Sequence, residues 1–208
     1  MLHRRLARLL AVAVVPASLV YLLVLFVAAA AGIEPGLVLS DLMQTCDEPI
    51  GVGMISNLGI LLWAAAAAIG LFASMSGLIL QKKWRQLLRL GGIFSAILCL
   101  DDFFLLHDRH ISPDVLYLCY AVFTVIVLVY FRQLILQVDG VAFLAAAIFL
   151  GSAVLIDQFQ PLQEQSPNLY ATVQLFEEGF KFIGIACWLT FWSQAARYGL
   201  KLQNLESS

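Results

Sequence analysis

Charged residues are scarce in this chain of 208 residues: 12% are Asp, Glu, Lys or Arg, against 62% hydrophobic residues. The mean hydropathy is +0.90. A soluble domain carries about 25% charged residues to cover its surface. The deficit excludes a water-soluble fold, because apolar side chains would face water on every side. The composition predicts a protein whose solvent is the lipid bilayer, folded as a single domain over residues 1–208.

Motifs of soluble catalysis are also missing. The chain has no G-x-x-x-x-G-K-[ST], G-x-S-x-G or H-E-x-x-H motif, and its four cysteines form no C-x-x-C pair. It has no basic stripe of the kind that binds nucleic acid. The loops are too short for a separate catalytic domain, so any chemistry must take place within the helices or at their outer ends.

Long apolar segments are what the chain does have. A transmembrane helix needs about 20 apolar residues. Six segments meet this length approximately, which predicts an all-α, polytopic bundle of about six transmembrane helices. The six segments are Leu9–Gly32, Met54–Leu80, Leu90–Asp108, Val115–Leu136, Val141–Asp157 and Leu169–Ala195.

Basic residues are distributed asymmetrically between the two sides of these segments. Ten of the 12 Lys and Arg residues fall on one side, whereas Arg109 lies on the other and Lys181 lies within the sixth segment. Basic loops face the cytoplasm, so we expect both termini to be cytoplasmic, in a bacterial inner membrane. The first segment is longer than the roughly 7–15 apolar residues of a signal peptide, which favours an uncleaved anchor.

Ionisable residues interrupt the third, fifth and sixth segments. Each charge at the centre of a span costs roughly 2.5–3.5 kcal/mol on insertion scales and therefore points to a function. The third segment carries Asp101, Asp102, His107 and Asp108, the fifth ends at Asp157, and the sixth carries Gln174, Glu177, Glu178 and Lys181.

The depths of these residues agree. Asp101 lies about 15 Å below the outer surface and Glu178 about 14 Å, from a rise of 1.5 Å per residue. We expect Glu177 or Glu178 to contact Lys181, with the aspartate pair opposite, in a polar column open to the outside. Six carboxylates against one lysine leave five negative charges, so the column needs protonation, a bound cation or water.

Other residues have simpler interpretations. Asn57 fits a helix start or an interhelical hydrogen bond, and it counts with Asp157 and Gln174 among the accessory polar residues. Tyr117 and Trp84 fit the aromatic belts at the membrane surface. Trp188 and Trp192 fit core packing, and the Ala64–Ala68 run and Gly91-Gly92 predict close helix contacts.

The polar helices resemble a known pattern. The third segment contains D-D-F-F-L-L-H-D from Asp101, and the sixth contains E-E-G-F-K from Glu177. With Ser56-Asn57-Leu58-Gly59, these segments are similar to a group of bacterial six-helix membrane proteins to which no activity is assigned. The resemblance covers nearly the whole chain and implies the same six-helix fold. That group commonly has Glu at the position of Asp108.

The leading hypothesis is a metal-dependent intramembrane hydrolase acting on a lipid-type substrate. One divalent metal, Zn, Mn or Fe, would offset the charge surplus. A water bound to that metal would need a base, and a developing oxyanion would need a cation. The expected ligands are Asp101, His107, Asp108 and Glu178, the expected base is Asp102 or Glu177, and the oxyanion would face Lys181.

Two alternatives remain open on the sequence. Carboxylates in the middle of the membrane also suit a carrier or channel for protons or cations. A structural or assembly protein, whose polar residues fix helix packing, is the third reading. The expected partners are the bilayer and a lipid or ion ligand, with no nucleic acid. The sequence does not specify the oligomeric state.

Overall fold

The computed structural model describes residues 11, 15–33, 46, 52–79, 81–106, 111–159 and 167–206. These residues form helices and connecting turns, with no β-strand among them, which confirms the all-α class. The chain divides into two units, Met1–Val52 and Gly53–Ser208.

The first unit contains the helix α2, Val15–Ala30, within the predicted first span. Its end follows from local geometry: the Ala31 amide still bonds back to the Val27 carbonyl at 3.0 Å, and Gly32 then adopts a left-handed φ of 73°. A glycine takes this conformation without the strain that a side chain would cause, so it ends the helix.

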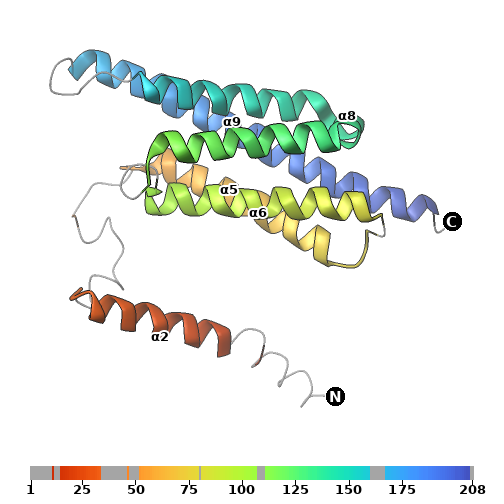
Figure 1. The fold of residues 1–208 in the computed structure, drawn as a ribbon, viewed down its shortest axis with the longest axis horizontal. Helices are drawn as coiled ribbons and strands as arrows, with labels where there is room; N and C mark the ends of the chain where they lie inside the picture. Colours follow the sequence, from red (N-terminus) through yellow and green to blue (C-terminus); the bar gives the residue numbers. More distant parts are fainter. Residues whose placement is uncertain are drawn as a thin grey trace. The chain divides into compact units, whose positions relative to one another are not determined.

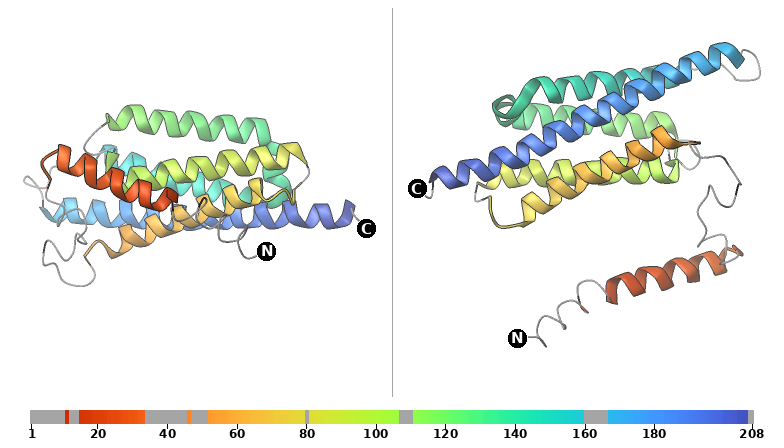
Figure 2. Two further views of the ribbon diagram at one scale, coloured as in Figure 1. Left: turned by 90° about the horizontal axis from the view of Figure 1, so that it is seen from below. Right: turned by 180° about the vertical axis from the view of Figure 1, so that it is seen from behind.

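The second unit is a bundle of long helices, drawn in Figure 1 and from two further sides in Figure 2. The helix α5 starts after Gly53, which has a left-handed φ of 65°. The last helix is continuous through the polar segment and beyond it. The helices are α5 (Met54–Met75), α6 (Lys82–Phe104), α8 (Pro113–Gln158) and α9 (Pro167–Glu206).

The helix α8 folds back on itself (Figure 1). Its backbone leaves the helical region at Phe131 and again at Asp139, where φ is −166° and ψ is 83°. The Asp139 carboxylate then accepts a hydrogen bond from the Ala142 amide at 3.0 Å, as a residue that caps a helix start does. Two antiparallel arms result: a first arm over residues 113–138 and a second arm over residues 140–158. They match the predicted fourth and fifth spans.

Two described helices, Met54–Met75 and Pro113–Gln158, are long and apolar enough to cross a membrane by length and composition. The helices α6 and α9 carry the acidic pairs and Lys181 within their apolar sequence. Their ends differ from the predicted spans, since α6 begins eight residues before Leu90 and α9 continues eleven residues past Ala195. Helical hydrogen bonding continues through residues that are too polar to count as a span.

Small residues bring α5 and α6 together, as the sequence predicts. A Cβ atom added to Gly70 would lie 2.9 Å from the Cα of Gly92, and one added to Gly92 would lie 2.7 Å from the backbone nitrogen of Leu71. Side chains at either glycine would hold the two backbones apart. Close approach through small residues is typical of helix pairs in membranes.

Aromatic residues fill the centre of the bundle. Phe143, Trp188 and Trp192 are almost fully buried, and the Trp188 and Trp192 rings lie 5.4 Å apart, which confirms the predicted packing role. Trp84 corrects a prediction. Its side chain is 1% exposed and its ring lies 5.3 Å from that of Tyr198, so it joins α6 to the end of α9 in the core instead of lying in an interfacial belt.

Candidate functional site

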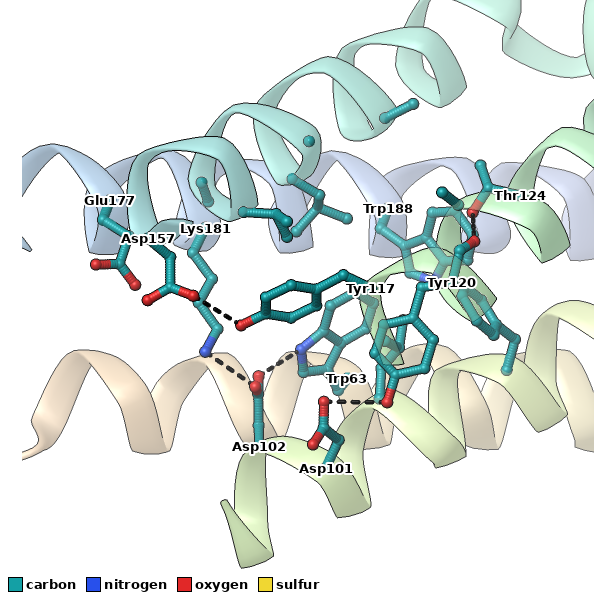
Figure 3. Close-up of a pocket in the computed structure, with 18 of the residues that line it drawn as sticks. Trp63, Asp101, Asp102, Tyr117, Tyr120, Thr124, Asp157, Glu177, Lys181 and Trp188 are labelled. Atoms are coloured by element: carbon teal, nitrogen blue, oxygen red, sulfur yellow. Dashed lines mark hydrogen bonds and ion pairs between the residues drawn. The ribbon is translucent and has the colours of Figure 1, made fainter. Parts of the chain in front are cut away.

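A cavity of about 360 Å³ lies within the second unit, bordered by α5, α6, both arms of α8 and α9 (Figure 3). Its size is at the lower end of the range for small-molecule sites, about 300–1,000 Å³. Most of its wall is apolar, and the polar and aromatic side chains reach it from every one of these helices. They are Trp63, Phe94, Asp101, Asp102, Tyr117, Tyr120, Thr124, Asp157, Glu177, Lys181 and Trp188.

An ion pair between helices forms one side of the cavity. The Lys181 ammonium on α9 lies 2.9 Å from one carboxylate oxygen of Asp102 on α6. The other oxygen accepts a hydrogen bond of 2.9 Å from the indole N–H of Trp63 on α5. The predicted approach of the third and sixth segments is therefore confirmed, with Asp102 as the partner of Lys181. Because both its oxygens are engaged, Asp102 is a weak candidate for the predicted general base.

The neighbouring carboxylate faces another helix. Asp101 is 3% exposed and accepts a hydrogen bond of 3.0 Å from the Tyr120 hydroxyl on the first arm of α8. Successive helical residues point about 100° apart. Asp101 therefore faces α8, whereas Asp102 faces α5 and α9, and both still border the same cavity.

A third carboxylate is held across the α8 hairpin. The Tyr117 hydroxyl on the first arm donates a hydrogen bond of 3.0 Å to Asp157 on the second arm. The residues lie near the open ends of the two arms, so the turn at Asp139 is what brings them together. Glu177 on α9 is half-buried and borders the same cavity, and Figure 3 shows its carboxylate toward the end where Asp157 lies.

The charges around the cavity do not balance. Four carboxyl groups and one ammonium group line it in the described part of the chain, which leaves three negative charges if all ionise. Such a surplus is costly away from bulk water unless protons, a cation or penetrating water offset it. The cavity is therefore suited to a positively charged ligand and unsuited to an anion.

The predicted metal ligands are not brought together by the residues that the structure describes. His107 and Asp108 lie outside the described residues. Asp101 borders the main cavity, but Glu178 borders a separate space of about 10 Å³ beside Ser56. Among the described residues, no group of three or more His, Cys, Asp or Glu side chains is placed to hold a metal ion.

Two accessory residues lie away from the cavity. Asn57 in the first turn of α5 and Gln174 in α9 are both exposed, and neither borders the cavity. Gln174, Glu177, Glu178 and Lys181 lie at i, i+3, i+4 and i+7, a spacing that would turn one polar helix face inward as a whole. This face turns inward from Glu177 onward, because α9 reaches the cavity about three turns after its start at Pro167.

Sequence reasoning missed the aromatic lining. Tyr117 is a cavity residue rather than solely a belt residue, and Tyr120, Trp63 and Trp188 were not expected to border a site. The spacing of Tyr117, Tyr120 and Thr124 at i, i+3 and i+7 was an available signal, since it puts three hydroxyl groups on one helix face.

Trp188 forms the floor of the cavity, and the buried Ser95 lies behind it. The Trp188 indole N–H donates a hydrogen bond of 2.8 Å to the Ser95 hydroxyl, which in turn donates to the Gly91 carbonyl at 2.8 Å. The Phe94 ring lies 5.8 Å from the Trp188 ring. Trp188 is thus held in a packed aromatic layer, and its indole N–H is satisfied by Ser95.

Comparison with known proteins gives a family without an assigned activity. No curated protein and no solved structure matches the chain. Residues 3–195 match the family described as "Domain of unknown function (DUF8692)", a match over most of the chain, and the chain belongs to this family.

Proposed function

We propose that the chain is an integral membrane protein with six spans and both termini in the cytoplasm, α2 and the two arms of α8 each supplying one span. The ends of the helices support this topology. The end of α5, the start of α6, the α8 turn and the end of α9 lie at one end of the second unit (Figure 1). These segments carry Lys82, Lys83, Arg85, Arg89, Arg132, Arg197 and Lys201. Such clustering is typical of the cytoplasmic side.

The function that the site supports best is the binding of a small organic cation. The observation that carries this proposal is the charge surplus of the described lining of the cavity: four carboxyl groups against one ammonium, which is itself paired with Asp102. A ligand that brings a positive charge would offset the surplus, and the carboxylates of Asp157 and Glu177 could accept charge-assisted hydrogen bonds from it.

The size and the walls of the cavity favour an organic ammonium ion over a bare metal ion. A volume of about 360 Å³ is far larger than a metal ion needs. The rings of Trp63, Tyr120 and Trp188 border the cavity, and aromatic faces attract ammonium groups. Recognition would combine carboxylates with aromatic faces, as is common for amine ligands.

The aromatic floor bears on transport. Trp188, hydrogen-bonded to Ser95, lies between the cavity and the buried Trp192 further along α9. A carrier would have to open this layer to release its cation into the cytoplasm. The geometry therefore supports a binding site that the cation enters from the outer side. Cation transport would in addition require a second conformation in which this aromatic layer is open.

The hydrolase stays a second proposal. It needs a metal held by some of Asp101, His107, Asp108 and Glu178, and it needs Lys181 to stabilise the developing oxyanion. The observation in its favour is that Glu177 borders the cavity together with Lys181, as a base and an oxyanion partner would. The engaged oxygens of Asp102 make Glu177 the better base of the two.

Isothermal titration calorimetry on the full chain in phosphatidylcholine nanodiscs tests the cation proposal. Ethylammonium and propionate have similar size and opposite charge. We expect saturable binding of ethylammonium, no binding of propionate, and weaker ethylammonium binding by Glu177→Gln. Asp114→Asn is the matched control, since Asp114 is exposed on α8 and does not border the cavity. The proposal would be contradicted if ethylammonium and propionate gave equal heats, or if ethylammonium gave the same heat with empty nanodiscs as with the protein.

A further inference from the structure

The cavity is polar at one end and mostly apolar toward the turn of the α8 hairpin. Asp157 and Tyr117 mark the polar end, near the open ends of the two arms. Further toward the turn, most of the wall is apolar and comes from both arms, including Ala121, Val125 and Leu150. The Tyr120 and Thr124 hydroxyls also lie there, and they donate to Asp101 and to the Tyr120 carbonyl. A ligand that fills this cavity would be charged at one end and apolar at the other.

The wall is open on the side of the α8 hairpin. Ala121, Val125 and Gly151 border the cavity and are exposed, Val125 by 56%. The exposed wall is built largely of small residues, and a Cβ atom added to Gly151 would meet nothing within 4 Å. In a protein that spans the bilayer, an apolar opening near the middle of the two α8 arms faces the acyl chains of the lipids.

From these observations we infer that the ligand is a long-chain amine that enters from the bilayer between the arms of α8. The inference rests on the proposed cation site. The ammonium head lies against Asp157 and Glu177, and the chain lies along Ala121 and Gly151. A phosphate next to the head would face the same carboxylates, and the ammonium of Lys181 is paired with Asp102. The ligand is therefore an amine without a phosphate.

The length of the chain is the variable that tests this inference. Ethylammonium, octylammonium and octan-1-ol are titrated calorimetrically into the full chain in phosphatidylcholine nanodiscs, with heats from empty nanodiscs subtracted. Burial of additional methylene groups should tighten binding. We expect octylammonium to bind at least tenfold more tightly than ethylammonium, and octan-1-ol, which lacks the charge, not to saturate.

A pair of glycine variants then tests the route of the chain. Gly151→Leu places a side chain in the opening, whereas Gly179→Leu places the same side chain on α9, where an added Cβ also meets nothing within 4 Å and no cavity is bordered. Gly151→Leu should weaken octylammonium binding about tenfold and leave ethylammonium binding within twofold. Gly179→Leu should leave both unchanged.

The outcomes separate the inference from the proposed function. If ethylammonium and octylammonium bind equally well, or if Gly151→Leu weakens both alike, the cavity does not take a chain through this opening. The inference of a long-chain amine is then wrong, while the proposed cation site stands. If neither amine binds to the wild type, both the inference and the cation site are overturned.

Discussion

The Asp102 carboxylate joins three helices of the second unit. It lies 2.9 Å from the Lys181 ammonium on α9 and accepts a hydrogen bond of 2.9 Å from the Trp63 indole on α5, while its own backbone belongs to α6. Exposed fractions of 11% for Asp102 and 27% for Lys181 leave the pair little contact with solvent. Loss of one partner would leave the other charge buried and unpaired.

A double-mutant cycle tests this ion pair. Lys181→Met should lower the free energy of unfolding by about 3 kcal/mol, because removing one partner of a buried pair leaves an uncompensated charge. Adding Asp102→Asn should restore at least half of the loss, since the pair then disappears as a unit. Unfolding by SDS in mixed micelles measures both.

Glu178→Gln is the control for the cycle, because Glu178 is one of the two partners of Lys181, with Glu177, that the sequence predicted. Combined with Lys181→Met, it should restore little, since Asp102 would still lack its cation. Rescue by Glu178→Gln that equals rescue by Asp102→Asn would contradict the assignment of the pair.

The contact between α5 and α6 gives a prediction about packing. Gly92→Ala should lower stability by about 1–3 kcal/mol, because the new Cβ would lie 2.7 Å from the backbone of Leu71 and overpack the contact. Gly179→Ala, where the added Cβ meets nothing, should leave stability unchanged or raise it by up to about 1 kcal/mol. Thermal unfolding in detergent compares the two variants; equal melting temperatures would mean that the helices do not approach closely here.

The topology predicts where a fused reporter will lie. In the proposed topology both termini are cytoplasmic, because the sequence assigns ten of the 12 basic residues to one side of the predicted spans. A cytoplasm-dependent fluorescent reporter fused after Ser208 should be active, and an alkaline phosphatase fusion there should be inactive. An active phosphatase fusion would invert the bundle and place the acidic cavity toward the cytoplasm.

Chelation distinguishes the two proposed functions. An organic ammonium ion needs no metal, so ethylammonium binding should be unchanged after exhaustive dialysis against EDTA. The hydrolase instead requires one tightly held divalent metal, which Asp101→Asn and Glu178→Gln should each release. Retention of stoichiometric zinc, manganese or iron by the purified protein, lost in these variants, would contradict an organic-cation site.

Helix positions could be predicted from the sequence because hydropathy and length determine them. The turn between the two arms of α8 is an example: Asp139-Gly140 interrupts the apolar run, and Asp139 caps the second arm. The ends of α6 and α9 could not be predicted in the same way, because hydrogen bonding extends a helix into residues that hydropathy counts as loop.

The site could be predicted in part. Equal depth indicated that the Asp101 and Asp102 pair and Lys181 belong to one cluster, and Asp102 and Lys181 are paired. Depth alone does not determine which of several carboxylates pairs with a lysine, since the pairing depends on the rotation of each helix about its axis. Trp63 and Tyr120 were missed because an aromatic residue in an apolar helix has the same pattern whether it fills a core or lines a cavity.

A charge series in the cavity tests the central claim most directly. Glu177→Gln, Asp157→Asn and the double variant remove one or two negative charges while keeping side-chain shape, and the Asn at 157 keeps an acceptor for Tyr117. Ethylammonium affinity should fall roughly tenfold per carboxylate removed, in line with loss of a charge-assisted contact. Asp114→Asn should match the wild type. A dissociation constant that stays the same across the series would contradict a cation site in this cavity.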